Sequence, residues 1–446
     1  MAYPAEFQKR MEELLGEDAP RFFAQLETEP CRSLRYNKKL LSESDLKALL
    51  GDAAGSAVPF TDNGFYFTLD GIGNTPLHHS GGVYVQEPAA MAPVAALGGE
   101  KAYAILDLCS APGGKSLQAA ESILAEDGIL VCNEPSAPRR RALMQNLERL
   151  GEKRCMVTGF DATKLPKEFY GFFDLVITDA PCSGEGMMRK NEEARENWSL
   201  ENVLSLAALQ GEILESAAKA VKDGGRILFA TCTWAREENE DNVVRFLENH
   251  PEFISIPPEE KVAQCAAKGL VEGTLRFYPH IFDGEGQFLA IFRREHGAEA
   301  PFSPKKKKEK SGKADPREAV VKKFLEEVLT TLPKKKLLFR EDEVFLTEDT
   351  PFPQELFVSP GVLIGSVQKG RVVPHHRFFR AYADSFRNRF TLPYTDPRIE
   401  AYLRGEEIEL AGSGYGVLFA DTLPLGGVKA SAGRGKNYYP KGLRKT

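Results

Sequence analysis

The sequence predicts an α/β protein built around a parallel β-sheet with helices on both faces. Three observations support this prediction. Apolar runs alternate with helical patterns from residue 103 to residue 250, a glycine-rich loop follows the first run, and a β-rich segment closes the chain. Such alternation is typical of parallel sheets, because each parallel connection needs a crossover helix. At 446 residues, the chain is long enough for several domains.

The central region contains five predicted strands. They are the apolar runs at 102–108, 128–134, 155–158, 172–181 and 224–233, and helical patterns occupy 116–125, 139–150, 206–221 and 237–250. A final hairpin is expected within 274–294, across the turn formed by Asp283, Gly284, Glu285 and Gly286. These patterns predict a Rossmann-like domain over residues 93–295.

The flanking regions have different patterns. Residues 1–92 combine helices with short aromatic strands, which predicts an N-terminal α+β accessory domain. Residues 296–316 contain a lysine run among Pro, Ser and Gly, which is typical of a linker. We expect a middle α/β accessory domain at 317–380, because an amphipathic helix precedes short strands, and a small β-rich module at 381–446.

Composition excludes several classes of protein. Hydrophobic residues make up 42% and charged residues 27%, as in ordinary globular proteins. There is no run of eighteen apolar residues that could span a membrane, and the first residues lack the apolar core of a secretory signal. The seven cysteines form no CxxC pair, so we expect no metal site. Reduced thiols and a cytoplasmic location are expected.

The net charge of −6 argues against a nucleic-acid partner, but the charge is unevenly distributed. From residue 428 to the end there are six basic residues and no acidic one. Basic residues interleaved with aromatic ones are typical of RNA-binding surfaces. The predicted RNA-binding residues are Arg434, Lys436, Tyr438, Lys441 and Arg444. The alternative is a solvated chain end.

The glycine-rich loop between the first strand and its helix reads DLCSAPGGKS, from Asp107 to Ser116. Glycines let backbone N–H groups approach a ligand, and a helix N-terminus favours negative charge. The dinucleotide pattern GxGxxG is absent, and Cys109 stands where a P-loop needs its first glycine. An S-adenosylmethionine site is therefore favoured over a nucleotide triphosphate site.

Two acidic residues follow the next two strands. Glu134 ends the second strand, twenty residues after Gly114, where a ribose-binding acid belongs in such folds. Asp161 follows the third strand and is a candidate partner for an adenine amino group. Ligands bind at the carboxyl ends of parallel strands, so we expect both acids beside the loop.

Two cysteines follow the last two parallel strands. Cys182 follows Asp179-Ala-Pro, and Cys232 lies within Thr-Cys-Thr. A cysteine is most often a small buried apolar residue, but a pair at neighbouring strand ends favours chemistry. Position alone supports either cysteine as a nucleophile.

These residues suit attack on a pyrimidine. A thiolate that adds to C6 of cytosine makes C5 nucleophilic toward a sulfonium methyl group. A carboxyl near N3 supports the added state, and Asp179 is placed for that role. The second cysteine can assist release, and a base in structured RNA must be flipped out to reach such a site.

The segments DLCSAPGGKS, DAPCSGEG and TCTWAREENE together resemble the NOL1/NOP2/Sun family of RNA cytosine-5 methyltransferases. The resemblance implies Cys232 as the nucleophile, Cys182 as the residue that assists release, and Lys190 as a basic residue near the active site. The implied cofactor contacts are Cys109, Ser110, Ala111, Pro112, Gly113, Gly114, Lys115, Glu134, Asp161 and Asp179. The chain has TCT where the family usually has TCS, and a hydroxyl is retained.

Further segments, including LHHSGGVYVQEPAAM and KNYYPKGLR, resemble a bacterial RsmF-like branch that acts on 16S ribosomal RNA. This resemblance implies a C-terminal PUA-like module, an RNA-binding role for the N-terminal domain, and rRNA of the small subunit or its precursor as the partner. We expect a monomer.

Three alternatives remain open at this stage. They are a tRNA cytosine-5 methyltransferase with the same core, an RNA-binding ribosome assembly factor with a vestigial core, and a DNA cytosine methyltransferase. The C-terminal module favours rRNA over tRNA, and the intact loop, Asp179 and both cysteines argue against a vestigial core. In the DNA enzyme, Cys182 would be the nucleophile and Cys232 would have no role.

Overall fold

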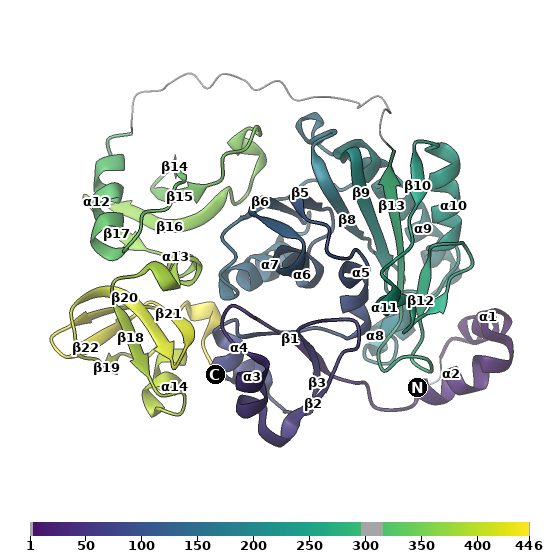
Figure 1. The fold of residues 1–446 in the computed structure, drawn as a ribbon, viewed down its shortest axis with the longest axis horizontal. Helices are drawn as coiled ribbons and strands as arrows, with labels where there is room; N and C mark the ends of the chain where they lie inside the picture. Colours follow the sequence, from purple (N-terminus) through teal and green to yellow (C-terminus); the bar gives the residue numbers. More distant parts are fainter. Residues whose placement is uncertain (1–2, 296–314, 446) are drawn as a thin grey trace.

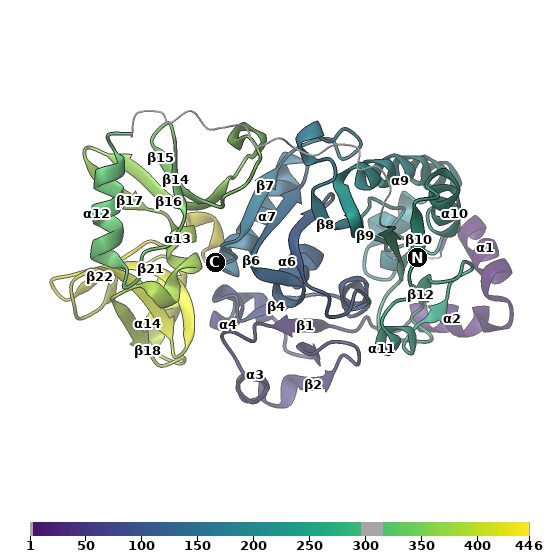
Figure 2. The same ribbon diagram turned by 45° about the horizontal axis from the view of Figure 1, so that its top comes forward.

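The computed structural model describes residues 3–295 and 315–445, so the predicted linker lies almost wholly outside the described residues. Figure 1 shows the central sheet with the N-terminal domain beneath it and two C-terminal units at its left. Figure 2 shows the same arrangement from another side. None of the helices in the described ranges is long and apolar enough to cross a membrane.

The central sheet has the predicted parallel core. Its strands are β5 (Ala102–Asp107), β6 (Leu124–Asn133), β7 (Cys155–Thr158), β8 (Phe173–Asp179) and β9 (Val221–Thr231), in the order β7-β6-β5-β8-β9. The antiparallel strand β13 (Gln287–Arg294) extends it beside β9, and is followed by β12 (Leu275–Phe277), β11 (Ala267–Lys268) and, on a branch, β10 (Phe253–Ser255). The predicted hairpin is the pair β12 and β13.

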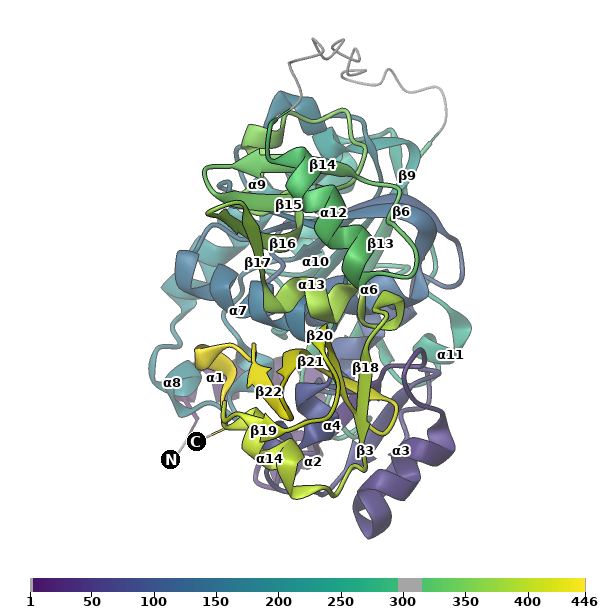
Figure 3. The ribbon, with the colours of Figure 1, turned by 90° about the vertical axis from the view of Figure 1, so that its left-hand side faces the viewer.

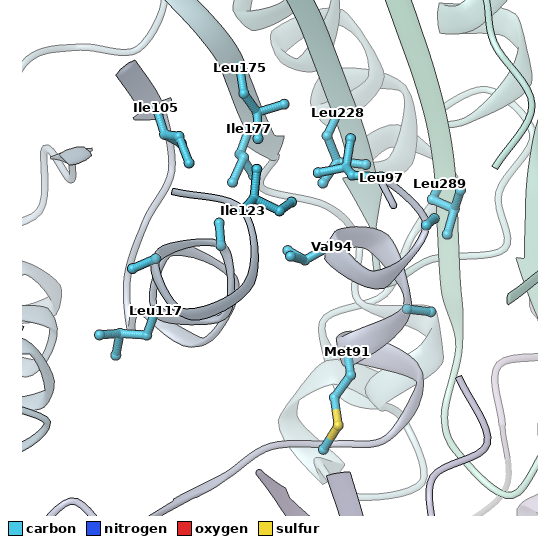
Figure 4. Close-up of a cluster of buried hydrophobic side chains, with 14 of the residues drawn as sticks. Met91, Val94, Leu97, Ile105, Leu117, Ile123, Leu175, Ile177, Leu228 and Leu289 are labelled. Atoms are coloured by element: carbon cyan, nitrogen blue, oxygen red, sulfur yellow. The ribbon is translucent and has the colours of Figure 1, made fainter. Parts of the chain in front are cut away.

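Two apolar cores cover the two faces of this sheet. One face packs against α5 (Ala92–Ala95), α6 (Gly114–Ser122) and α7 (Ala137–Arg149), and the other against α9 (Leu200–Ala220) and α10 (Glu240–Asn249). Successive strand residues point to opposite faces, so Leu228 joins the first core and Ile227 the second. In Figure 4, Val94 and Leu97 face Leu228 across the first core. The short helices α8 (Glu192–Glu196) and α11 (Glu260–Ala263) lie in connections.

The N-terminal domain has a helical and a sheet part. Its elements are α1 (Ala5–Leu15), α2 (Ala19–Leu26), β1 (Ser33–Tyr36), α3 (Glu43–Leu50), β2 (Ala54–Ala57), β3 (Gly64–Phe67), α4 (Pro76–His79) and β4 (Val83–Val85), with an antiparallel sheet in the order β2-β3-β1-β4. A capping box between Ser42 and Asp45 starts α3. Phe7 of α1 and Phe22 of α2 pack against Trp234, close to the end of β9.

The middle unit contains α12 (Glu318–Val328), β14 (Lys336–Arg340), β15 (Glu343–Thr347), β16 (Gly361–Gln368), β17 (Arg371–Pro374) and α13 (His376–Ala381). The last unit contains β18 (Arg389–Leu392), α14 (Pro397–Leu403), β19 (Ile408–Glu409), β20 (Gly414–Ala420), β21 (Leu423–Ser431) and β22 (Arg434–Asn437). The predicted boundary at residue 380 falls inside α13. Figure 3 shows this helix between the two sheets, and Phe378 and Phe379 belong to a core shared by both units.

The middle unit also covers the free edge of the central sheet. Val157 of β7 pairs with Ser359 as an antiparallel bridge, in which the Val157 N–H donates to the Ser359 carbonyl at 2.8 Å. Phe352 inserts into the central core, with ring centroids 4.7 Å from both Phe169 and Phe172. The edge strand is therefore sealed by a later part of the same chain.

This packing predicts that Phe352→Ala lowers the free energy of unfolding by about 3–5 kcal/mol, because it leaves a cavity in a core shared by two units. Chemical denaturation followed by tryptophan fluorescence measures the change. Val358→Ala is the matched control, since Val358 is 48% exposed, and it is expected to change the value by less than about 0.5 kcal/mol. Equal effects of the two variants would contradict the packing.

Candidate active site

The carboxyl ends of the parallel strands meet at one edge of the central sheet. Strands β5, β6, β8 and β9 end at Asp107, Asn133, Asp179 and Thr231, and the loops that follow carry the predicted site residues. Parallel strands all present their carboxyl ends at the same edge, so residues far apart in the chain become neighbours there.

The loop after β5 is organised by the buried carboxylate of Asp107. It accepts hydrogen bonds from the Cys109 N–H at 3.2 Å and from the Ser116 hydroxyl at 2.5 Å. Burial raises the pKa of Asp107 to about 7, and the charge of Asp179 adds to the rise, while the Ser116 hydrogen bond opposes it. Asp107 therefore ties the start of the predicted loop, at Cys109, to its end, at Ser116.

Gly113 is where the loop turns into α6. Its φ of +110° lies in a region that residues with a Cβ rarely adopt, and a Cβ there would stand 3.1 Å from Leu143. No side chain of the described residues caps the start of α6, and the backbone N–H groups of a first helical turn have no partner within the helix, a usual arrangement for binding an anionic group.

Glu134 follows β6 and is 1% exposed. One carboxylate oxygen accepts the Ser136 N–H at 2.9 Å, and the other lies 3.5 Å from the Arg139 guanidinium. That second oxygen is buried and has no hydrogen-bond donor among the described residues. It is an acceptor left free for a hydroxyl group at this edge.

Asp161, after β7, is more open than Glu134. Its side chain is 53% exposed, and it accepts hydrogen bonds from the N–H and the hydroxyl of Thr163 at 3.0 and 2.8 Å. These two hydrogen bonds lower its pKa. The carboxylate is thus held in one orientation at the rim of the strand ends.

Asn133 is a residue that the sequence analysis did not select. Its side-chain amide donates to the carbonyls of Leu108 and Phe160, and its oxygen accepts from the Phe160 N–H and the Thr158 hydroxyl. It therefore joins the loops after β5, β6 and β7. The signal in the sequence was a polar residue at the end of an otherwise apolar strand, just before Glu134.

Lys115 connects the glycine-rich loop to the end of β8. Its ammonium lies 2.9 Å from the Asp179 carboxylate, and its side chain is 9% exposed. Burial lowers the pKa of Lys115, but the Asp179 charge and hydrogen bond, together with the influence of Cys232, outweigh it and leave the pKa raised. The loop, Asp179 and the cysteines therefore form one electrostatic unit.

The two cysteines come together as the sequence predicts. The register of β8 and β9 sets Asp179 opposite Ala230, and the sulfurs of Cys182 and Cys232 lie 3.2 Å apart. Both residues are partly exposed. The contact with the Cys232 sulfur raises the pKa of Cys182 well above its ordinary value, and the packed surroundings raise it further. Because its pKa is raised in this way, Cys182 keeps its proton.

Lys190 has different neighbours. Its ammonium lies 3.4 Å from a carboxylate oxygen of Glu285 and 3.4 Å from the Cys31 carbonyl. Arg189 forms the closer ion pair with Glu285, at 2.8 Å. Lys190 therefore helps to join the loop after Cys182 to the β12–β13 connection and to the N-terminal domain.

The predicted RNA-binding residues divide into three environments. Arg434, Lys436 and Lys441 are exposed. Tyr438 is half-buried, with ring centroids 5.7 Å from Tyr415 and 5.8 Å from Phe379, and Arg444 packs beside Gly405. Only the first three are fully available to a partner, because packing selects which residues of the tail stay at the surface.

A separate cavity of about 560 Å³ lies between the N-terminal domain and α6, lined by residues such as Asn63, Leu117 and Glu121. None of the predicted site residues lines it. Among the residues that the structure describes, no group of three or more His, Cys, Asp or Glu side chains could hold a metal ion.

The raised pKa of Asp107 predicts a pH dependence of stability. Between the ordinary value of 3.8 and about 7, the folded chain binds a proton that the unfolded chain has lost, so the contribution of this group falls as pH rises. The asparagine in Asp107→Asn cannot ionise. The melting temperature of this variant minus that of the unmodified chain is therefore expected to increase from pH 5 to pH 8. Scanning fluorimetry of both proteins measures it, with the exposed Asp161→Asn as control. A pH-independent difference would contradict the assignment.

Comparisons with known proteins agree with this architecture. The family profile described as 16S rRNA methyltransferase RsmB/F matches residues 94–293. Profiles for the N-terminal domain of 16S rRNA methyltransferase RsmF and for the RsmF PUA domain match residues 3–88 and 389–445. The predicted PUA-like module is confirmed.

Similar proteins match over nearly the whole chain. "Ribosomal RNA small subunit methyltransferase F" of a Shewanella species (strain MR-4) is 31% identical over 93% of this chain and 91% of its own length. The Citrobacter koseri protein of the same name is 32% identical over 92% of this chain and 90% of its own. A crystal structure of a methyltransferase homologue from Pyrococcus horikoshii superposes with a TM-score of 0.56, at 26% identity, over 66% of this chain and 96% of that one.

These matches confirm the resemblance that the motifs indicate. The Rossmann-like core carries the glycine-rich loop and the two cysteines at one edge, and relatives match it together with the N-terminal and PUA domains. The chain is a member of the 16S rRNA methyltransferase RsmB/F family, whose enzymes use S-adenosylmethionine.

Proposed function

We propose that this chain methylates C5 of cytosine in the small-subunit (16S) rRNA or its precursor, with Cys232 as the nucleophile. The observation that carries the proposal is the pair of sulfurs 3.2 Å apart at the ligand edge of the sheet, joined to the cofactor loop through Lys115 and Asp179. The rRNA substrate is supported by the names of the relatives that match nine-tenths of the chain.

The residues at the strand ends fit S-adenosylmethionine. The buried Glu134 oxygen without a donor suits a ribose hydroxyl, Asp161 suits an adenine amino group, and the turn at Gly113 presents backbone N–H groups to a carboxylate. The residues that would hold the cofactor are Cys109, Ser110, Ala111, Pro112, Gly113, Gly114, Lys115, Glu134, Asp161 and Asp179. When bound, S-adenosylmethionine supplies a methyl group on a sulfonium, which is electrophilic.

The thiolate of Cys232 begins the reaction. Its sulfur forms a bond to C6 of cytosine, the C5–C6 double bond opens, and the electron pair makes C5 nucleophilic. C5 then gains the methyl group and still carries its proton. A solvent water molecule takes that proton, the C–H electron pair restores the C5–C6 double bond, the bond between Cys232 and C6 breaks, and Cys232 leaves as the thiolate.

Cys182 and Asp179 serve different parts of this cycle. Cys182 keeps its proton beside Cys232, so it can donate a hydrogen bond to the departing sulfur and assist release. Asp179 lies at the end of β8 with its carboxylate held by Lys115, where it can accept a hydrogen bond from N3 of the added base when that nitrogen carries a proton. Lys190 acts through Glu285, by holding the loop after Cys182 in place.

The accessory units are proposed to bind the RNA around the target base. Residues 1–92 and the PUA module at 381–446 flank the Rossmann-like domain at 93–295, and residues 317–380 join them. Arg434, Lys436 and Lys441 are exposed cations near the end of the module, whereas Tyr438 and Arg444 are proposed to shape the surface that presents them.

The roles of the two cysteines can be separated by substitution. Cys232→Ala is expected to lower methyl transfer to a 16S rRNA transcript by at least about 10³-fold, since the ring is no longer activated. Cys182→Ala is expected to accumulate a covalent RNA–protein adduct, because release is impaired. Denaturing gels with labelled RNA detect the adduct, and a tRNA transcript serves as the alternative substrate.

Cys265→Ala is the matched control. Cys265 is partly exposed and lies just after α11, outside the two loops that carry Cys182 and Cys232, so its substitution should leave both readouts unchanged. An adduct in Cys232→Ala but not in Cys182→Ala would reverse the assignment. Faster transfer to the tRNA transcript than to the 16S transcript would favour the tRNA enzyme.

The exposed cations of the PUA module predict a salt effect. In Arg434→Ala/Lys436→Ala, the slope of log affinity for the 16S transcript against log salt should become shallower by about 1 to 2, because each lost phosphate contact removes about 0.7 to 0.9. Fluorescence anisotropy at several salt concentrations measures it. Arg434→Lys/Lys436→Arg keeps the charge and is the control. Equal slopes for the unmodified chain and both double variants would exclude this surface as an RNA contact. Point variants are preferred to deletion from residue 380, which would open the core around Phe378 and Phe379.

A further inference from the structure

Two loops carry the cysteines, and each also carries a buried glutamate. The loop after β8 contains Cys182 and Glu185, and the loop after β9 contains Cys232 and Glu238. Glu185 is 2% exposed and Glu238 is fully buried. Among the described residues, neither carboxylate forms an ion pair within 4 Å. Buried acids without a charged partner are costly, so their hydrogen bonds need an explanation.

Glu238 reaches across to the loop of the other cysteine. One of its carboxylate oxygens accepts the Ser183 N–H at 2.9 Å and a side-chain N–H of Gln210 at 2.8 Å. The other oxygen accepts the Ser183 hydroxyl in a short hydrogen bond. Ser183 directly follows Cys182, so the position of Cys182 depends on an acid from the Cys232 loop.

Glu185 makes the reciprocal connection. One carboxylate oxygen accepts the Trp234 N–H at 2.9 Å, and the other accepts the indole N–H of Trp198 at 2.9 Å. Trp234 lies two residues after Cys232. The hydroxyls of Ser183 and Thr233 also meet at 2.9 Å, so the residues that directly follow the two cysteines touch each other.

Backbone packing makes this arrangement tight. The Gly186 N–H donates to the Cys232 carbonyl at 2.9 Å, and a Cβ on Gly186 would stand 2.5 Å from the Cα of Gly286. Burial raises the pKa of both glutamates, and their hydrogen bonds oppose the rise. The loops thus have no room to shift without breaking these contacts.

We infer that Glu185 and Glu238 are positioning residues, and that each holds the loop of the opposite cysteine so that the two sulfurs stay 3.2 Å apart. The inference rests on the proposed cysteine chemistry for its catalytic consequence but not for its geometry. Neither glutamate touches a reacting atom. Their effect is to keep the thiol of Cys182 in reach of the Cys232 sulfur when the bond to C6 breaks.

Two readouts on the full-length protein test this inference. The first is the rate at which diamide converts the two thiols to a disulfide, followed by intact mass and peptide mapping. Diamide takes two electrons and two protons from the thiols and becomes its hydrazine, so the rate reports how often the sulfurs meet. The second is methyl transfer to the 16S transcript with saturating S-adenosylmethionine.

Glu238→Ala is expected to slow disulfide formation by about tenfold and to lower kcat by about 10²-fold, as a displacement near 1 Å would. The affinity for S-adenosylmethionine should stay within about twofold, because the glycine-rich loop has its own hydrogen bonds. Glu238→Gln should recover most of both rates, since its oxygen can accept from Ser183 and Gln210 while its amide donates to the Ser183 hydroxyl.

Glu185→Gln should behave differently. Both oxygens of Glu185 accept hydrogen bonds from N–H donors, of Trp234 and Trp198. In the glutamine variant, the side-chain NH2 group would stand opposite one of these N–H groups, and two donors cannot form a hydrogen bond. Both rates should therefore fall in this conservative variant. Glu248→Ala, on the exposed face of α10, is the control and should match the unmodified chain.

The outcomes are distinct. Disulfide formation at the normal rate in Glu238→Ala would overturn the inference. A Glu238→Gln variant that forms the disulfide at the normal rate but does not transfer methyl groups would also overturn it, because the carboxylate would then act through its charge. Slow disulfide formation with normal methyl transfer would support the geometry and overturn the proposed cysteine chemistry. If Glu238→Ala fails to fold, Ser183→Ala removes the hydroxyl hydrogen bonds to Glu238 and Thr233 but keeps the Ser183 N–H bond to Glu238, and the inference requires a smaller fall in both rates.

Discussion

The parallel pairing of β8 with β9 is the constraint on which the rest of the site depends. Their register sets Asp179 opposite Ala230, so the loops after both strands leave the sheet side by side. Two cysteines that are fifty residues apart in the chain thereby come within 3.2 Å. The adjacency of β5 and β8 brings the glycine-rich loop to the same edge, where Lys115 meets Asp179.

The N-terminal helices contribute to this geometry from outside the sheet. Arg10 of α1 forms an ion pair at 2.6 Å with Glu237, in the loop after Cys232. Arg189, in the segment after Cys182, donates to the carbonyl of Gln25 in α2 at 3.0 Å. The two helices therefore contact both cysteine loops, so the N-terminal domain supports the candidate active site as well as extending its surface.

The C-terminal units are joined to the other domains by buried guanidinium groups. Arg380 of α13 donates to the carbonyl of Arg149 at 2.7 Å and to the carbonyl of Ser80, and Arg149 donates to the carbonyls of His78 and Val83 at 2.8 Å. Burial lowers the pKa of both arginines to about 10, so they stay charged at neutral pH. Tyr439 adds a hydrogen bond to His79 at 2.6 Å. The PUA module is thus held in a fixed orientation relative to the Rossmann-like domain.

The sequence by itself determined the strand–helix alternation, the glycine-rich loop, and the placement of Glu134 and both cysteines after their strands. These features depend on periodicity and backbone preferences that act over a few residues. Only the tertiary structure decided that Asn133 joins three loops, that Glu185 and Glu238 cross between the cysteine loops, and that Tyr438 is half-buried while Arg434 and Lys436 are exposed. It also showed that the units around α13 share a core, so that a boundary drawn from strand and helix patterns at residue 380 divides a helix. The physical reason is that a buried polar or aromatic group finds its partners through packing between distant segments, which no local pattern records.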